Sequence, residues 1–186
     1  MVARWIKSDL GQVAPTFGFK IETLLYPSPQ DSHLNYTLHL WDIGGQRTIR
    51  SYWRNYYEET DGLVFVIDAA APHRLSENLE ELQTLLAQDR LANASVLVLI
   101  NKQDCSGALS GSEISQILRL EDIFDSNRCG ERGERGKTAW NVFESSVITG
   151  MNIDKALAWL VSDIASRIYR LQPGPDRNPQ DIVINL

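Results

Sequence analysis

Polar and apolar residues alternate along two early segments of the chain. FGFKIETLLY (17–26) and YTLHLWDI (36–43) both repeat with a period of two, which is typical of half-buried β-strands. The connection at 27–35 contains two prolines and several turn-forming residues, so it reads as a long hairpin loop. The pattern predicts an antiparallel pair of strands.

Continuous apolar runs follow at GLVFVID (62–68) and SVLVLIN (95–101). Such runs are typical of parallel strands that are covered on both faces. Leucines at helical spacing over 74–91 and apolar residues over 151–171 predict helices that lie on this sheet, and NVFESSVI (141–148) is a further strand candidate. Alternating strands and helices predict an α/β fold with a doubly wound sheet.

The composition is that of one soluble globular domain, with 186 residues, 43% hydrophobic residues and a net charge of −6. The negative charge argues against nucleic acid as a partner. No apolar run approaches the ~20 residues that cross a bilayer. Val2 stands where N-myristoylation needs a glycine, and the ending VINL is no prenylation box. We expect a cytoplasmic protein with no membrane anchor of its own, and a flexible tail at 172–186, where three prolines occur.

A polar cluster, DIGGQ (42–46), follows the second expected strand. Ligands of open α/β sheets collect outside the carboxyl ends of the strands. There, Asp42 can hold Mg²⁺, a glycine N–H can approach a γ-phosphate, and Gln46 can orient an attacking water. A tight turn after a strand gives the same D-x-x-G pattern, which is therefore weak evidence when taken alone.

A second cluster, NKQD (101–104), directly follows a buried apolar run. A fixed, buried carboxylate on Asp104 can accept two N–H groups from guanine, and adenine would leave it unpaired. Lys102 can lay its aliphatic stem over the base, and Asn101 can tie the loop to its neighbours. A polar helix-capping loop is the alternative interpretation.

Two shorter signals accompany these clusters. SSVITG (145–150) is a small-residue loop that either caps the last helix or contacts a ligand. Pro15-Thr16-Phe17-Gly18 offers the hydroxyl of Thr16, which can bind Mg²⁺ only when a γ-phosphate is present and so form a switch. An ordinary turn would look the same.

Taken in order, PTFGF, WDIGGQ, RSYWRNYYEETDGLVFVID and NKQD resemble the small GTPases of the Arf and Arf-like family, from residue 3 to near residue 170. Trp41 and the aromatic run at 52–57 are of Arf type, although the aromatic run can also be simple core. RSYWRNYYEETDGL is most similar to the branch that works with tubulin-folding cofactors and prenyl-binding carrier proteins. The resemblance implies a small-GTPase-type sheet, GTP or GDP with Mg²⁺, slow GTP hydrolysis, and effector, exchange-factor and GTPase-activating partners at residues 15–60.

The resemblance also assigns roles to single residues. It makes Gln46 the catalytic residue that positions water, and Thr16 and Asp42 the Mg²⁺ ligands. The GTP-binding residues that it implies are Thr16, Asp42, Gly45, Asn101, Lys102, Asp104, Ser146 and Val147. Val147 departs from the family's Ala, which leaves a backbone N–H contact possible. Insertions at 27–35 and 125–140 also depart from the family pattern.

The family's phosphate loop, G-x-x-x-x-G-K-[ST], does not occur in the 186 residues. GERGERGKT (130–138) ends like one, but Glu131 replaces the required first glycine and no apolar strand precedes it. We therefore expect a domain at 1–171 that is incomplete before switch I, with its first central strand missing and inner edges unpaired. Three hypotheses remain: a GTP switch, a nucleotide-free interaction module, and an incomplete gene product without function.

Overall fold

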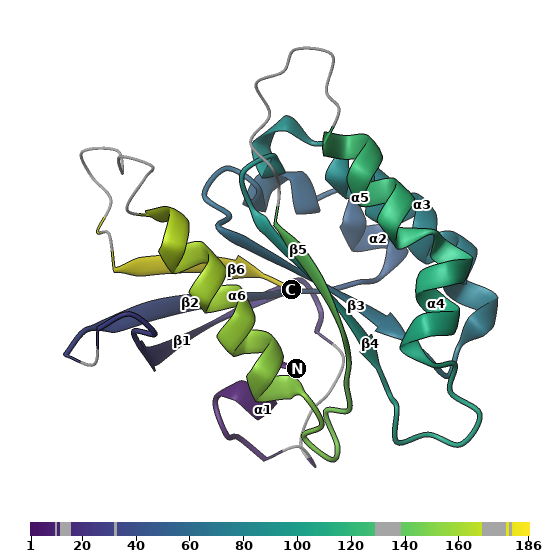
Figure 1. Cartoon of the computed structure of the whole chain (residues 1–186), viewed down its shortest axis with the longest axis horizontal. Helices are drawn as coiled ribbons and strands as arrows, with labels where there is room; N and C mark the ends of the chain where they lie inside the picture. The colour runs from purple at the N-terminus through teal and green to yellow at the C-terminus, as the bar shows by residue number, and fades with distance from the viewer. Residues whose placement is uncertain (10, 12–15, 32, 129–138, 169–177, 179) are drawn as a thin grey trace.

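The computed structural model describes residues 1–9, 11, 16–31, 33–128, 139–168, 178 and 180–186. Within these residues, six strands form one mixed sheet in the order β1-β2-β6-β3-β4-β5 (Figure 1). The strands are β1 (Phe19–Pro27), β2 (Asn35–Ile43), β3 (Gly62–Asp68), β4 (Ser95–Asn101), β5 (Trp140–Glu144) and β6 (Asp181–Asn185). The β1–β2 pair is antiparallel and the other pairs are parallel. The doubly wound α/β class predicted from the sequence is confirmed.

Helices cover both faces of the sheet (Figure 1). The α-helices are α1 (Val2–Trp5), α2 (Arg47–Arg50), α3 (Leu75–Leu86), α4 (Gly111–Leu118), α5 (Leu120–Arg128) and α6 (Ile153–Ile168), and the 3-10 turns are η2 (Trp53–Tyr56), η3 (Pro72–Arg74) and η4 (Asp89–Leu91). Helices α3 and α6 lie within the predicted ranges 74–91 and 151–171. Helices α4 and α5 were not predicted.

The apolar core has two parts, one on each face of the sheet. Helices α3, α4 and α5 pack on one face, and α1 and α6 pack on the other. Strand β4 serves both parts, because its residues at 96, 98 and 100 face the first cluster and those at 97 and 99 face the second. All five are almost fully buried, which explains why this strand is apolar without alternation. Among the described residues, no helix has both the length and the apolar character needed to cross a membrane.

Strand β6 takes the central place in the sheet, between β2 and β3. Its residues 181–185 pair in parallel with residues 37–41 of β2 and, at two positions, with the start of β3. The side chains of Ile182 and Ile184 are fully buried on the α6 side of the sheet. The prediction of a flexible tail is therefore wrong for this segment, and so is the prediction that the inner strands have unpaired edges along it.

The physical reason lies in the three β-branched residues Ile182, Val183 and Ile184, which favour an extended backbone and present two isoleucines to one face. The prolines that precede them in sequence concealed this short strand. Residues 169–177 and 179, which belong to the same predicted tail, lie outside the described residues. So do residues 129–138, which include the GKT sequence and most of the second insertion.

Candidate functional site

The end of β2 and the segment before β1 bring the two predicted Mg²⁺ ligands together. The hydroxyl of Thr16 donates to Oδ2 of Asp42 at 2.8 Å, although 26 residues separate the two in sequence. Beside them, the Gly44 N–H donates to the carbonyl of Gly18 at 2.8 Å. A Cβ on Gly44 would lie 2.7 Å from the carbonyl oxygen of Thr16, so only glycine allows this close approach.

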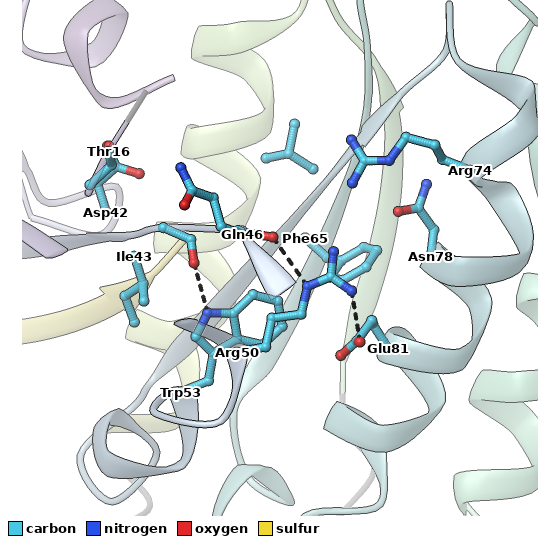
Figure 2. A pocket seen from close by; sticks show the side chains of 13 residues that line it. Thr16, Asp42, Ile43, Gln46, Arg50, Trp53, Phe65, Arg74, Asn78 and Glu81 are labelled. Carbon is cyan, nitrogen blue, oxygen red and sulfur yellow. Dashed lines mark hydrogen bonds and ion pairs between the residues drawn. The ribbon is translucent and has the colours of Figure 1, made fainter. Parts of the chain in front are cut away.

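Thr16, Asp42 and Gly44 line one side of a pocket of about 470 Å³, shown in Figure 2. The opposite side comes from η3 and α3, where Arg74, Asn78 and Glu81 lie. The full lining consists of Thr16, Asp42, Ile43, Gly44, Gly45, Gln46, Arg50, Trp53, Phe65, Val66, Arg74, Asn78 and Glu81. Gly45 and Gln46 are exposed, so the two residues assigned to the γ-phosphate and the water face open space.

Two residues to which the sequence analysis gave no role at the site, Trp53 of the aromatic run and Arg50, hold this loop in place. The indole Nε1 of Trp53 donates to the Gly44 carbonyl at 3.1 Å, and Nε of Arg50 donates to the Gly45 carbonyl at 3.1 Å. Arg50 is anchored in turn by Glu77 at 2.8 Å and Glu81 at 2.7 Å. Burial alone would lower the pKa of Arg50, but these two carboxylates raise it above its usual value. The sequence signal for Arg50 and Trp53 was their position shortly after GGQ.

The loops after β4 and β5 form one hydrogen-bonded network. The side-chain oxygen of Asn101 accepts the Val147 N–H at 3.1 Å, and the hydroxyl of Ser146 donates to Asp104. The backbones are also joined, because the Gln103 N–H donates to the Ser145 carbonyl at 3.1 Å. The structure therefore places the predicted base-contacting residues of NKQD and SSV side by side.

Lys102 is fixed at the same edge of the sheet by a partner that sequence reasoning missed. Its Nζ lies 2.6 Å from Oδ2 of Asp68, the last residue of β3. The hydrogen bond that Lys102 donates to this carboxylate raises the pKa of Lys102. An acidic residue at the end of the apolar run GLVFVID was the available sequence signal, because parallel strands end at one edge.

The prediction of a buried Asp104 carboxylate is wrong, since Asp104 is exposed. It lies in the loop beyond β4, where the chain has already left the core. The hydrogen bond from Ser146 lowers the pKa of Asp104, so the carboxylate is charged at neutral pH and can act as a paired acceptor. Without a covering ligand, however, water can hydrogen-bond to this carboxylate. A base that leaves it unpaired therefore costs less binding free energy than it would if the carboxylate were buried.

The described residues fit a nucleotide in part. The Asp104 carboxylate, which Ser146 holds, could accept the two N–H donors of guanine, and the Val147 N–H holds Asn101 beside it. Thr16 and Asp42 can supply two oxygen ligands, whereas Mg²⁺ prefers six and often takes the rest from phosphates and water. Among the residues that the structure describes, no cluster of three His, Cys, Asp or Glu side chains is arranged to hold a metal.

The sheet and its loops define a small GTPase fold. The structure matches the Arl6 BBS3 small GTPase from Trypanosoma brucei, solved with the bound nucleotide analogue GppNp, with a TM-score of 0.70. The two share 21% identity, and the match covers 89% of this chain and 90% of that one, so the likeness concerns the fold alone.

Sequence comparison gives the family. The model of the ADP-ribosylation factor family matches residues 1–164. The chain is 44% identical over 171 residues to the ADP-ribosylation factor-like protein 2 of Drosophila melanogaster, covering 92% of this chain and 83% of that protein. It is 45% identical over 163 residues to the protein of the same description in Arabidopsis thaliana, covering 88% and 78%.

The chain therefore belongs to the ADP-ribosylation factor family, and the family resemblance read from the sequence is confirmed. Membership supports a GTP-binding switch, and it supports GTP hydrolysis and regulation by partner proteins in general terms.

Proposed function

We propose that this protein is an Arf-like switch that binds GTP or GDP and distinguishes them at the loop after β2. The observation that carries the proposal is the joined network of the loops after β4 and β5, in which Asn101 and Asp104 are held by Val147 and Ser146. A helix-capping loop has no need for a fixed, charged carboxylate, with its two acceptor oxygens, in the loop beyond β4. Guanine, with two adjacent N–H donors, does fit such a pair.

Each part of the site then has its task. Asp104 accepts from the base, Lys102 lies along it while Asp68 holds its ammonium, and Ser146 and Val147 complete the contact. Thr16 and Asp42 would hold Mg²⁺, which neutralises charge on the phosphates when bound. Gly45 approaches the γ-phosphate through its N–H, and Gln46 orients water for slow hydrolysis.

In a chain to which a phosphate loop has been added, replacing Gln46 by leucine should leave GTP binding unchanged and slow hydrolysis by roughly 10-fold or more, because Gln46 orients water and does not hold phosphate. A single-turnover assay with a GTPase-activating protein measures this change. Thr48→Val, at an exposed position of α2 two residues after Gln46, serves as the control and should hydrolyse at the normal rate. Equal rates for Gln46→Leu and the unaltered chain would show that another group positions the water.

The proposal is tested directly by calorimetry of residues 1–186 with GTP, GDP and ATP in the presence of Mg²⁺. We expect weak binding that favours guanine, roughly 1000-fold weaker than a relative with a phosphate loop, because several charge-assisted bonds to phosphate are missing. Circular dichroism establishes that the chain is folded. Equal affinity for ATP and GTP would refute guanine recognition, and tight Mg²⁺-dependent binding abolished by Lys137→Ala would make 130–138 the phosphate site.

A second candidate function is an interaction module that needs no nucleotide. The observation in its favour is an aromatic cluster of Phe19, Trp41 and Tyr56, with ring centroids 5.5–5.8 Å apart. Phe19 is 50% exposed and the nearby Phe17 is 80% exposed, so an apolar surface is available within residues 15–60. Binding of a partner with equal strength in GTP, GDP and nucleotide-free buffer would favour this second function.

In either case the cluster is the proposed docking surface for effectors, exchange factors and activating proteins. Because the sequence is most similar to the branch that works with them, we propose tubulin-folding cofactors or prenyl-binding carriers as effectors. We further propose that the protein acts in the cytoplasm, in a process linked to microtubules or to the trafficking of lipidated proteins. Phe19→Ala should weaken effector capture at least ~10-fold, because truncating an exposed aromatic anchor removes a typical hot spot. Leu25→Ala, exposed on the same strand, is the matched control for a capture assay.

A further inference from the structure

The residue that follows β6, Leu186, pairs with the end of β2, directly before the loop at 44–46. The Leu186 N–H donates to the Trp41 carbonyl at 2.9 Å, and the Ile43 N–H donates to the Leu186 carbonyl at 3.1 Å. These two bonds lie on either side of Asp42 in the sequence. The segment that completes the sheet therefore also fixes the backbone of the residue assigned to Mg²⁺.

Strand β6 is also connected to the loop at 44–46 through the side chain of Asn185, which is 3% exposed. Its Nδ2 donates to the Tyr56 carbonyl and to the Thr60 hydroxyl, both at 2.7 Å. The Thr60 hydroxyl donates to the same Tyr56 carbonyl at 2.7 Å. Tyr56 is the last residue of η2, and Trp53, the first, donates to the Gly44 carbonyl.

Packing alone does not explain an asparagine at this position. Asn185 borders a small cavity of about 40 Å³ whose other lining is largely apolar, including Leu63, Phe65 and Leu85. Its Oδ1 is buried and has no hydrogen-bond partner in the described part of the chain, which costs stability. The packing task of β6 belongs to Ile182 and Ile184 on the opposite face. A leucine at 185 would fill the site without a buried unpaired acceptor.

We propose that Asn185 is a positioning residue: through Tyr56, Thr60 and η2 it holds the loop at 44–46 in the conformation that the switch requires. The two faces of strand β6 then act differently, since its isoleucines stabilise the sheet and its asparagine holds the loop at 44–46 in place. That this positioning serves a nucleotide switch rests on the proposed function, whereas the positioning of the loop by Asn185 does not. It is therefore tested without nucleotide.

The experiment is hydrogen exchange by mass spectrometry on the full chain and three variants. Asn185→Leu removes the amide, Thr60→Val removes its partner hydroxyl at similar volume, and the third variant combines them. We expect amides in 44–56 to exchange roughly 10-fold faster in all three variants, while those of β4 keep their rates. The double variant should exceed neither single one, because both changes break one network. Val183→Thr, on the same face of β6, is the control and should change nothing in 44–56.

Faster exchange spread equally over 44–56 and β4 would show that Asn185 acts only on overall stability, and unchanged exchange in 44–56 would show that it does not hold the loop. Either result overturns the proposal. If Asn185→Leu does not fold, Asn185→Ser gives the same comparison. Additive effects of Asn185→Leu and Thr60→Val would also contradict it, because the two side chains would then act independently. Loss of nucleotide binding with an intact exchange pattern would count against the proposed function alone.

Discussion

Replacing Ile184 by alanine should lower the free energy of unfolding by about 3 kcal/mol. The side chain is fully buried in the cluster shared by β2, β6 and α6, and truncating such an isoleucine removes apolar contacts and leaves a cavity. A stability margin of only ~5–15 kcal/mol is typical of a domain, so the loss is large. Urea unfolding followed by circular dichroism measures it.

Leu25→Ala is the matched control, because Leu25 lies on β1 and is 70% exposed. Its effect should stay within about 0.5 kcal/mol. A change of that size for Ile184→Ala as well would mean that β6 does not occupy the centre of the sheet in solution. The flexible tail predicted from the sequence would then be correct after all.

The strands that were predicted correctly are those whose pattern is decided by burial. β4 and most of β3 are apolar because both of their faces are covered there. β1 alternates because much of it faces solvent, and β2 alternates because one of its faces is only partly buried. Helix α4 was missed although the sequence contains a signal for its first residues. Ser110 and Glu113 form a capping box, a pattern that marks helix beginnings. Its eight residues are too few for a clear helical period.

Strand β6 was missed for a different reason, which is that its place depends on a distant part of the chain. A run of three β-branched residues predicts an extended segment, but only the vacancy between β2 and β3 makes it a central strand. The same holds for the site. Sequence spacing placed Asn101 and Asp104 on one loop, whereas the pairing of Lys102 with Asp68 joins the ends of two strands. The exposure of Asp104 also depends on how its loop leaves the sheet, which no local pattern encodes.

Asp104→Asn should reverse the base preference of the site. Guanine offers two N–H donors to a carboxylate, and an asparagine can accept only one of them because its other group is itself a donor. Xanthine carries an oxygen acceptor in place of guanine's amino group, so it suits the asparagine. We expect GTP affinity to fall by roughly 100-fold, the value of one or two bonds to a charged group, and xanthosine triphosphate to bind better than GTP.

The exposed position of Asp104 sets the upper limit of this effect, because water can satisfy a side chain that the base leaves unpaired. The loop itself should survive, since the asparagine carbonyl can still accept from Ser146. Competition of GTP and xanthosine triphosphate against a fluorescent guanine nucleotide measures both affinities. Asp122→Asn, which removes the same charge from an exposed position on α5, should leave both unchanged. If Asp104→Asn binds GTP as the unaltered chain does, the base is recognised elsewhere, and the network of Asn101 and Ser146 is only a structural connection between two loops.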